Sequence, residues 1–315
     1  MSNGKAFSSF TVAAAALSVL AAGLAPAVAG PVQMPGLEER TLVSGTGLAY
    51  RIFIAAPEEP PPAAGYPVAY VLDGNAVAGT LADLARAQGV RQGGLMAPAV
   101  LVAIGYPGDL AINMPRRAKD LTSAPATPGE GSWTYLKPEQ TGGADAFLAF
   151  IQDELKPAIA ASYKVDPKRQ ALIGHSFGGL FALHALFARP DAFSLYVAAS
   201  PSLWWANGAI AAEEAAFAAR PPAGHRRLLL TVGAYEQELH PGLRRQPDAP
   251  ELARKLAQRR MVDGARDLAA RLDALPGRPV EVTFAILPGQ THMSAAPHAL
   301  LLGLETFLGP EGEEP

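Results

Sequence analysis

The stretch that decides the fold runs from residue 170 to residue 180 and reads Gln-Ala-Leu-Ile-Gly174-His175-Ser176-Phe177-Gly178-Gly179-Leu180. An apolar run of strand length precedes the G-x-S-x-G motif, and a helical pattern follows it. Small residues two positions before and after a serine allow the backbone to double back sharply. Such a turn exposes Ser176 at the positive end of a helix, which favours a developing oxyanion. The segment therefore predicts Ser176 as a nucleophile, the alternative being a serine that only caps a helix.

The rest of the chain alternates apolar runs with helical patterns. Continuous apolar runs favour strands that are buried on both faces, as in a parallel sheet. Pro157 is expected to kink or end the first of the long helices, and residues 108–139 read as a long irregular loop. The pattern predicts a doubly wound, mostly parallel α/β sheet. The expected strands are 67–72, 99–104, 170–173, 195–198, 228–232 and 280–287, and the expected helices are 144–163, 177–187, 249–275 and 297–308.

The composition narrows the class of protein. The 315 residues are 49% hydrophobic and 17% charged, which is typical of a globular chain with a large core. A net charge of −3 without a Lys/Arg cluster gives no electrostatic footprint for nucleic acid. Cysteine is absent, which excludes disulfides, thiolate zinc sites and a cysteine nucleophile. The six histidines form no metal-binding motif, so neither a metal nor another cofactor is expected.

The first 29 residues resemble an export signal. Lys5 supplies a positive charge, an apolar stretch runs from Phe10 to Leu24, and Ala27-Val28-Ala29 forms a small-x-small cleavage site. The alternative is an anchor that stays on the chain. We expect cleavage, a single domain over residues 30–315 without a membrane span, and a periplasmic or secreted location.

A serine of ordinary pKa needs a base within hydrogen-bonding reach. In chains with this nucleophile turn the order is serine, acid, histidine. His292 directly follows the last expected strand and is the predicted base, with His298 as the weaker choice. His184 is expected to be structural. His175 is expected to be structural as well and to point away from Ser176 into the strand layer.

The acid is expected after the strand at 228–232. Glu236 comes first in that loop and is the predicted acid, and Glu238 is the next choice. An acid orients the imidazole without taking its proton, so a Ser–His pair without a carboxylate stays open.

The oxyanion hole requires two backbone N–H groups. One is expected from Phe177, which follows the nucleophile, and the other from Gly74 or Asn75 in the turn after an early strand. Glycine at position 74 permits an unusual backbone conformation there.

These motifs together resemble the putative-esterase branch of the α/β-hydrolases, and within it the esterases of enterobactin-, salmochelin- and bacillibactin-type siderophores. One departure from the family pattern lies at Gly233-Ala234, where a Gly-Glu-x-Glu loop is expected. The resemblance covers nearly all of the chain after the leader. It is carried by Val71–Asn75, Arg116–Thr122, Gly142–Leu148, Glu154–Pro157, Gly174–Leu183, Ser200–Trp205 and Gly289–His292.

The resemblance implies a small-molecule ester as substrate, and specifically the ester backbone of a catecholate trilactone. Arg116 and Arg117 would bind its negative charge. The Ser-Pro-Ser202-Leu-Trp204-Trp205 run would form the pocket wall, with the tryptophans stacking on an aromatic acyl group or else filling core space. Competing hypotheses are a feruloyl, acetyl-xylan or broad acyl esterase, and a non-catalytic binding protein on the same fold.

Overall fold

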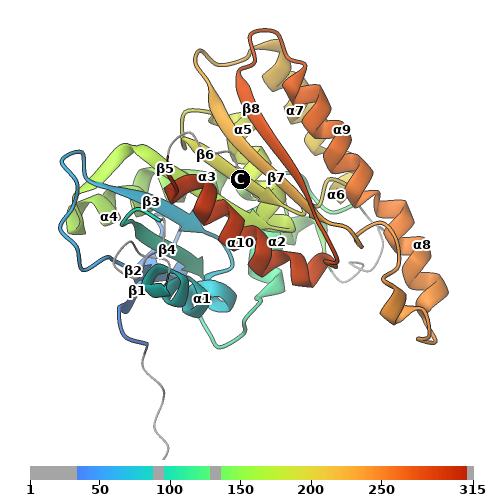
Figure 1. Ribbon diagram of the computed structural model, residues 1–315, viewed down its shortest axis with the longest axis horizontal. Coiled ribbons are helices and arrows are strands. Elements are labelled where there is room, and N and C mark those ends of the chain that lie inside the picture. Colours follow the sequence, from blue (N-terminus) through green and yellow to red (C-terminus); the bar gives the residue numbers. More distant parts are fainter. Residues whose placement is uncertain (1–33, 88–95, 128–135, 311–315) are drawn as a thin grey trace, which may run out of the picture. The chain divides into compact units, whose positions relative to one another are not determined.

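The sequence folds into one eight-stranded sheet covered by helices on both faces, as Figure 1 shows for the computed structural model. The structure describes residues 34–87, 96–127 and 136–310. Residues Pro35–Pro315 form one compact unit. The predicted leader, residues 1–29, lies outside the described part of the chain.

The elements have the following bounds. The strands are β1 Leu37–Val43, β2 Ala49–Ala55, β3 Tyr66–Val71, β4 Val100–Gly105, β5 Val165–His175, β6 Leu195–Ala199, β7 Arg226–Gly233 and β8 Val280–Leu287. The helices are α1 Gly74–Ala87, α2 Met114–Leu121, α3 Ala144–Phe150, α4 Lys156–Ser162, α5 Phe177–Ala188, α6 Trp205–Gly208, α7 Ile210–Ala219, α8 Ala249–Arg259, α9 Met261–Asp273 and α10 His292–Leu308. A π-helical turn, Ile151–Leu155, joins α3 to α4, and 3₁₀ turns cover Pro138–Gln140 and Pro241–Leu243.

The strand order is β1-β2-β4-β3-β5-β6-β7-β8. All neighbours from β4 to β8 pair in parallel, whereas β1 pairs with β2, and β2 with β4, in antiparallel fashion. The predicted doubly wound, mostly parallel α/β-hydrolase architecture is confirmed. The antiparallel pair at the edge is an addition that the expected strands did not include.

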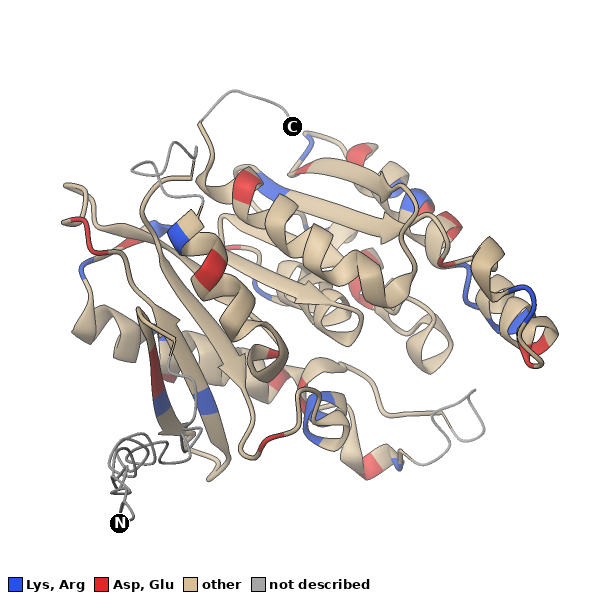
Figure 2. Cartoon of the chain, turned by 60° about the horizontal axis from the view of Figure 1, so that its bottom comes forward, with Lys and Arg blue, Asp and Glu red and all other residues tan. Residues whose placement is uncertain are grey.

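The sheet separates two apolar cores. Strands β3, β4 and β6 contain no charged residue, and in Figure 2 the charged residues gather mostly on edge strands, helices and loops. Val68 and Tyr70 of β3 join the core under α3 and α5, while the alternate Ala69 and Val71 join the core under α1 and α10. Burial on both faces explains why these strands read as continuous apolar runs.

Four expectations about helices need correction. The expected helix at 249–275 is two helices, because Arg260 adopts a left-handed conformation with φ 47°. The last helix begins at His292 rather than at residue 297 and keeps Pro297 inside it. The expected irregular stretch 108–139 contains α2. Of the two alternatives for Pro157, an end of the helix is wrong, because α4 continues to Ser162, whereas a local irregularity, the π-helical turn Ile151–Leu155, does lie directly before this proline.

Candidate active site

Ser176 occupies a strained turn between β5 and α5, with φ 62° and ψ −115°. A Cβ on Gly174 would lie 2.3 Å from the carbonyl oxygen of Gly178, and one on Gly179 would lie 2.6 Å from that of Ala199. A Cβ on Gly178 would meet the Leu72 side chain at 3.4 Å, an ordinary contact. The turn therefore excludes side chains at Gly174 and Gly179. Backbone conformations of this kind are maintained by the surrounding structure and cluster at functional sites.

Three side chains from separate loops form one hydrogen-bonded line at this turn. Nε2 of His292 lies 3.0 Å from Oγ of Ser176, and Nδ1 of His292 lies 2.6 Å from Oε2 of Glu236. Glu236 is 1% exposed, and its other oxygen accepts from Ser200 Oγ at 2.5 Å and from Gly233 N at 2.6 Å. The carboxylate is thus fixed from three directions and can orient the imidazole.

The structure brings the predicted nucleophile, base and acid together, and it brings Glu236 rather than Glu238 onto His292. His298, the weaker candidate base, bonds a carbonyl within α10. His184 bonds Glu213 inside the helical layer, as expected of a structural histidine. The arrangement is that of a Ser-His-Glu triad, in which Glu236 holds the tautomer that leaves Nε2 free to accept the serine proton.

The turn after β3 differs in detail from the expectation for the oxyanion hole. The left-handed conformation lies at Asp73, with φ 58°, and not at Gly74. Gly74 is needed for space instead, because a Cβ there would lie 2.8 Å from the backbone nitrogen of Gly105. The side chain of Asn75 accepts from the Tyr106 N–H at 2.7 Å and donates to the Tyr106 carbonyl at 2.9 Å. The turn is therefore fixed against the end of β4.

Phe177 begins α5, so its N–H lies at the helix N-terminus next to the nucleophile. Its ring packs edge-on against Trp205, with centroids 4.9 Å apart. Trp205 is 2% exposed and donates from its indole nitrogen to the Ala124 carbonyl. Of the two alternatives predicted for Trp205, the structure favours filling of core space over stacking on a substrate, because the ring is buried against Phe177. Trp204 is partly exposed, and the guanidinium of Arg259 lies 4.6 Å from its ring centroid.

Arg117 was expected to bind an anionic ligand, but its side chain is buried against the active-site turn. Nε and Nη2 donate to the two carboxylate oxygens of Asp73 at 2.8 and 2.9 Å, and Nη2 also reaches the His175 carbonyl at 3.3 Å. A bidentate pair of this kind is strong and directional. Arg117 therefore fixes the position of Asp73 and of the nucleophile turn rather than presenting a charge to substrate.

Arg116 faces a different part of the molecule. Its guanidinium packs beside the rings of Tyr50 and Tyr106, at 5.0 and 5.2 Å from their centroids, and lies 3.6 Å from Asp120. The predicted role in substrate binding is not supported for this residue either. Because α2 presents successive residues in different directions, one arginine serves the active site while its neighbour serves a separate cluster.

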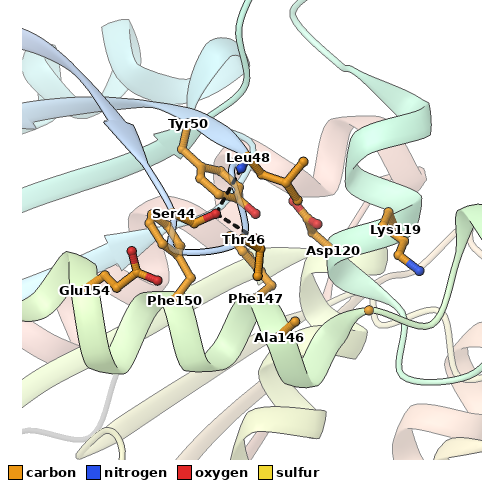
Figure 3. Close-up of a pocket in the computed structure, with 11 residues that line it drawn as sticks. Ser44, Thr46, Leu48, Tyr50, Lys119, Asp120, Ala146, Phe147, Phe150 and Glu154 are labelled. Carbon is orange, nitrogen blue, oxygen red and sulfur yellow. Dashed lines mark hydrogen bonds between the residues drawn. The ribbon is translucent and has the colours of Figure 1, made fainter.

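That cluster borders a cavity of about 70 Å³ between α2, the β1–β2 turn and α3 (Figure 3). Tyr50, Phe150 and Asp120 line it together, and none of the triad residues does. Asp120 is 3% exposed, and within the described residues its Oδ2 has no hydrogen-bond partner. Burial raises the pKa of Asp120 to about 6, although the charge of Arg116 opposes the shift.

Two residues near the nucleophile were not predicted to take part. Ser200, with φ 45°, follows β6 and donates to Glu236. His175 was expected to point away from the site, but its ring lies 4.6 Å from that of His292. The predicted wall residue Ser202 is buried, with its Oγ 3.4 Å from Ser176 Oγ. The periodicity of the sequence carried no signal for any of these contacts, because they arise where three strand ends meet.

Residues 44–265 match the family model described as "Putative esterase". The chain belongs to this esterase family. Among curated proteins, the ferri-bacillibactin esterase of Bacillus subtilis (strain 168) is 36% identical over 288 residues, which cover 89% of this chain and 92% of the relative. The siderophore triacetylfusarinine C esterase of Aspergillus fumigatus is 37% identical over 255 residues, covering 77% and 83%.

A solved structure supports the same assignment. A siderophore hydrolase from Aspergillus nidulans superposes with a TM-score of 0.77 at 29% identity and covers 91% of this chain and all of its own, 100%. Family membership and the site geometry together make the chain a carboxylic ester hydrolase of the serine type. Among the residues that the structure describes, no helix combines the length and apolarity needed to cross a membrane.

Proposed function

We propose that this esterase cleaves the ester backbone of a catecholate trilactone siderophore by an acyl-enzyme mechanism. The observation that carries the mechanism is the hydrogen-bonded line from Ser176 through His292 to Glu236. The substrate class rests on the relatives, because the proteins that match most of the chain are named for siderophore esters.

In the acylation step, Oγ of Ser176 attacks the ester carbonyl while its proton moves to Nε2 of His292. Glu236 accepts the Nδ1–H bond throughout and stabilises the imidazolium without being protonated. The tetrahedral oxyanion is held by the N–H of Phe177 and by an N–H of the turn at Gly74 and Asn75. The imidazolium then protonates the departing alkoxide, which leaves as the alcohol end of the opened lactone.

In the deacylation step, water attacks the acyl-serine carbonyl and gives its proton to Nε2 of His292. Collapse of the second tetrahedral intermediate returns that proton to Ser176 Oγ. The product is a free carboxylic acid, and the enzyme is restored. The distances at the three residues suit this proton path without rearrangement, because the base is already within hydrogen-bonding reach of the nucleophile.

The proposal is tested by offering the protein a trilactone siderophore, with and without iron, beside a feruloyl ester and a p-nitrophenyl ester. We expect hydrolysis of the trilactone with the highest kcat/KM, and loss of all three activities by about 10⁴-fold or more in Ser176→Ala. Cleavage of the simple esters alone would replace the siderophore by another acyl ester as substrate. Full activity of Ser176→Ala would contradict the mechanism itself.

Export is the second part of the proposal and is supported by the sequence of residues 1–29. Release of the leader after Ala29 would place the enzyme where an imported or external siderophore is met. N-terminal sequencing of the protein recovered from the periplasm or medium should begin at Gly30. Recovery of the intact N-terminus in the cytoplasm would reject export.

A further inference from the structure

The ring of His292 is held by hydrogen bonds at its two nitrogens. Glu236 bonds Nδ1 and Ser176 bonds Nε2. Hydrogen bonds at Nδ1 and Nε2 restrain the positions of these two atoms, but they restrain the inclination of the ring plane less strongly. What packs against the ring face therefore decides whether Nε2 stays aimed at the serine oxygen.

His175 supplies such a face contact. Its ring centroid lies 4.6 Å from that of His292, with the ring planes inclined by 40°. The side chain of His292 remains 34% exposed, so the ring is supported on the protein side and open to solvent elsewhere. His175 thus lies directly before the nucleophile in the sequence and beside the base in space.

The backbone of His175 is itself well anchored. It is the last residue of β5 and pairs with Ala199 of β6, and its carbonyl accepts from Nη2 of Arg117 at 3.3 Å. Because Arg117 also binds Asp73, the residue beneath the His292 ring is tied to the same cation that fixes the oxyanion turn. A support built on two hydrogen-bonded strands is rigid, which is what positioning of a catalytic side chain requires.

The surroundings also keep this support uncharged. Burial, together with the charges of His292 and Arg117, lowers the pKa of His175 to about 3. The ring consequently stays neutral when His292 becomes an imidazolium during turnover, so no like-charge repulsion arises between the two rings. Within the described part of the chain, Nε2 of His175 is buried without a hydrogen-bond partner.

We infer that His175 is a positioning residue for this hydrolase, whose ring limits the tilt of His292 and keeps its Nε2 aimed at Ser176. The inference rests on the serine-hydrolase mechanism proposed above and is independent of the siderophore as substrate. It assigns His175 no proton transfer and no contact with the reacting atoms.

The test compares a variant that keeps an aromatic ring with one that removes it. On a p-nitrophenyl ester, His175→Asn should lower kcat about 10- to 100-fold with little change in KM, because a misplaced base affects the chemical step. His175→Phe should stay within about threefold of the wild type. The rate of labelling by a fluorophosphonate should follow the same order, since it reports the activation of Ser176 without turnover.

His184→Asn is the matched control, since it removes a buried imidazole that bonds Glu213 in the neighbouring helical layer. It should lower the melting temperature and leave kcat nearly unchanged. His175→Gln serves as a second ring-free variant should His175→Asn fail to fold. Wild-type kcat in a folded ring-free variant, or an equal loss in His175→Phe, would overturn the inference. Activity that survives in Ser176→Ala would instead overturn the serine-hydrolase mechanism on which the inference about His175 rests.

Discussion

Two carboxylates, Glu236 and Asp120, are both buried but differ in their hydrogen-bond partners. Glu236 is 1% exposed and has three hydrogen-bond partners, namely Ser200 after β6, Gly233 at the end of β7 and His292 at the start of α10. Asp120 is 3% exposed, lies 3.6 Å from Arg116, and has one oxygen without a hydrogen-bond partner among the described residues. Burial raises the pKa of Asp120 to about 6.

The difference shows that burial of an acid does not by itself identify a catalytic group. A carboxylate that accepts well-placed hydrogen bonds is held in one orientation, as the acid of a triad must be. A carboxylate whose bonds are incomplete is held in the fold at a free-energy cost and becomes sensitive to pH. In this enzyme the first kind lies behind His292 and the second borders the cavity of Figure 3.

Among the variants that test the contrast between the two carboxylates, Glu236→Ala is expected to have the largest effect on kcat. Loss of the carboxylate removes the partner that fixes the imidazole tautomer, so kcat on any hydrolysed ester should fall by about 10³- to 10⁴-fold. Glu238→Ala, in the same loop, is the control and should keep nearly full activity. Nearly wild-type turnover by Glu236→Ala would mean that Ser176 and His292 act as a pair.

The next largest effects are expected from variants of the two arginines of α2, which should differ in stability and in kcat. Arg117→Met leaves the largely buried Asp73 carboxylate without its bidentate partner, so it should cost about 3 to 5 kcal/mol of unfolding free energy and lower kcat. Arg116→Met should leave kcat close to the wild-type value, because Arg116 bonds none of the triad or turn residues. Urea unfolding and steady-state kinetics measure both. Equal losses of kcat in the two variants would contradict the assignment of separate roles.

Much of the fold could be predicted because the central strands are buried on both faces. Runs such as Pro67–Leu72 are continuously apolar and are therefore recognised as buried strands. The motif around Ser176 indicates the strand–turn–helix unit. The edge hairpin of β1 and β2 escaped because it pairs antiparallel and is partly exposed, which weakens its pattern. The break at Arg260 escaped because a left-handed arginine has no sequence signature.

The site was predictable to the extent that it follows strand ends. Ser176, Glu236 and His292 each follow a parallel strand, so their meeting follows from topology. The predicted role of Arg116 and Arg117 in substrate binding was wrong, because a charged side chain in an apparent loop is expected to be exposed unless its buried partner is known. Asp73 lies 44 residues before Arg117, and no local pattern links the two. His175 was misjudged for a related reason, since its ring contact depends on where the final helix begins.

The smallest effect is expected from Asp120→Asn and is a change in how the free energy of unfolding depends on pH. Its folded pKa of about 6 lies above the ordinary value of 3.8 for an aspartate, so protonation favours the folded state. This contribution is fully present below about pH 3.8 and is lost as the pH rises through about 6. Asp120→Asn should therefore be stabilised relative to the wild type by an amount that grows between pH 4 and pH 7 and approaches at most about 3 kcal/mol.

Unfolding in urea at pH 5 and pH 8 measures this difference, and subtraction of the two proteins cancels every other titrating group. Replacement of the carboxyl group by an amide adds a pH-independent offset, so only the change with pH is diagnostic. The attraction between ionised Asp120 and Arg116 is already included in the folded pKa of about 6. Asp83→Asn, at an exposed carboxylate of α1, should give a nearly constant difference over the same range. A difference for Asp120→Asn that is equally flat would mean that the cavity hydrates this carboxylate as well as bulk water does, and the contrast with Glu236 would then lie in orientation alone.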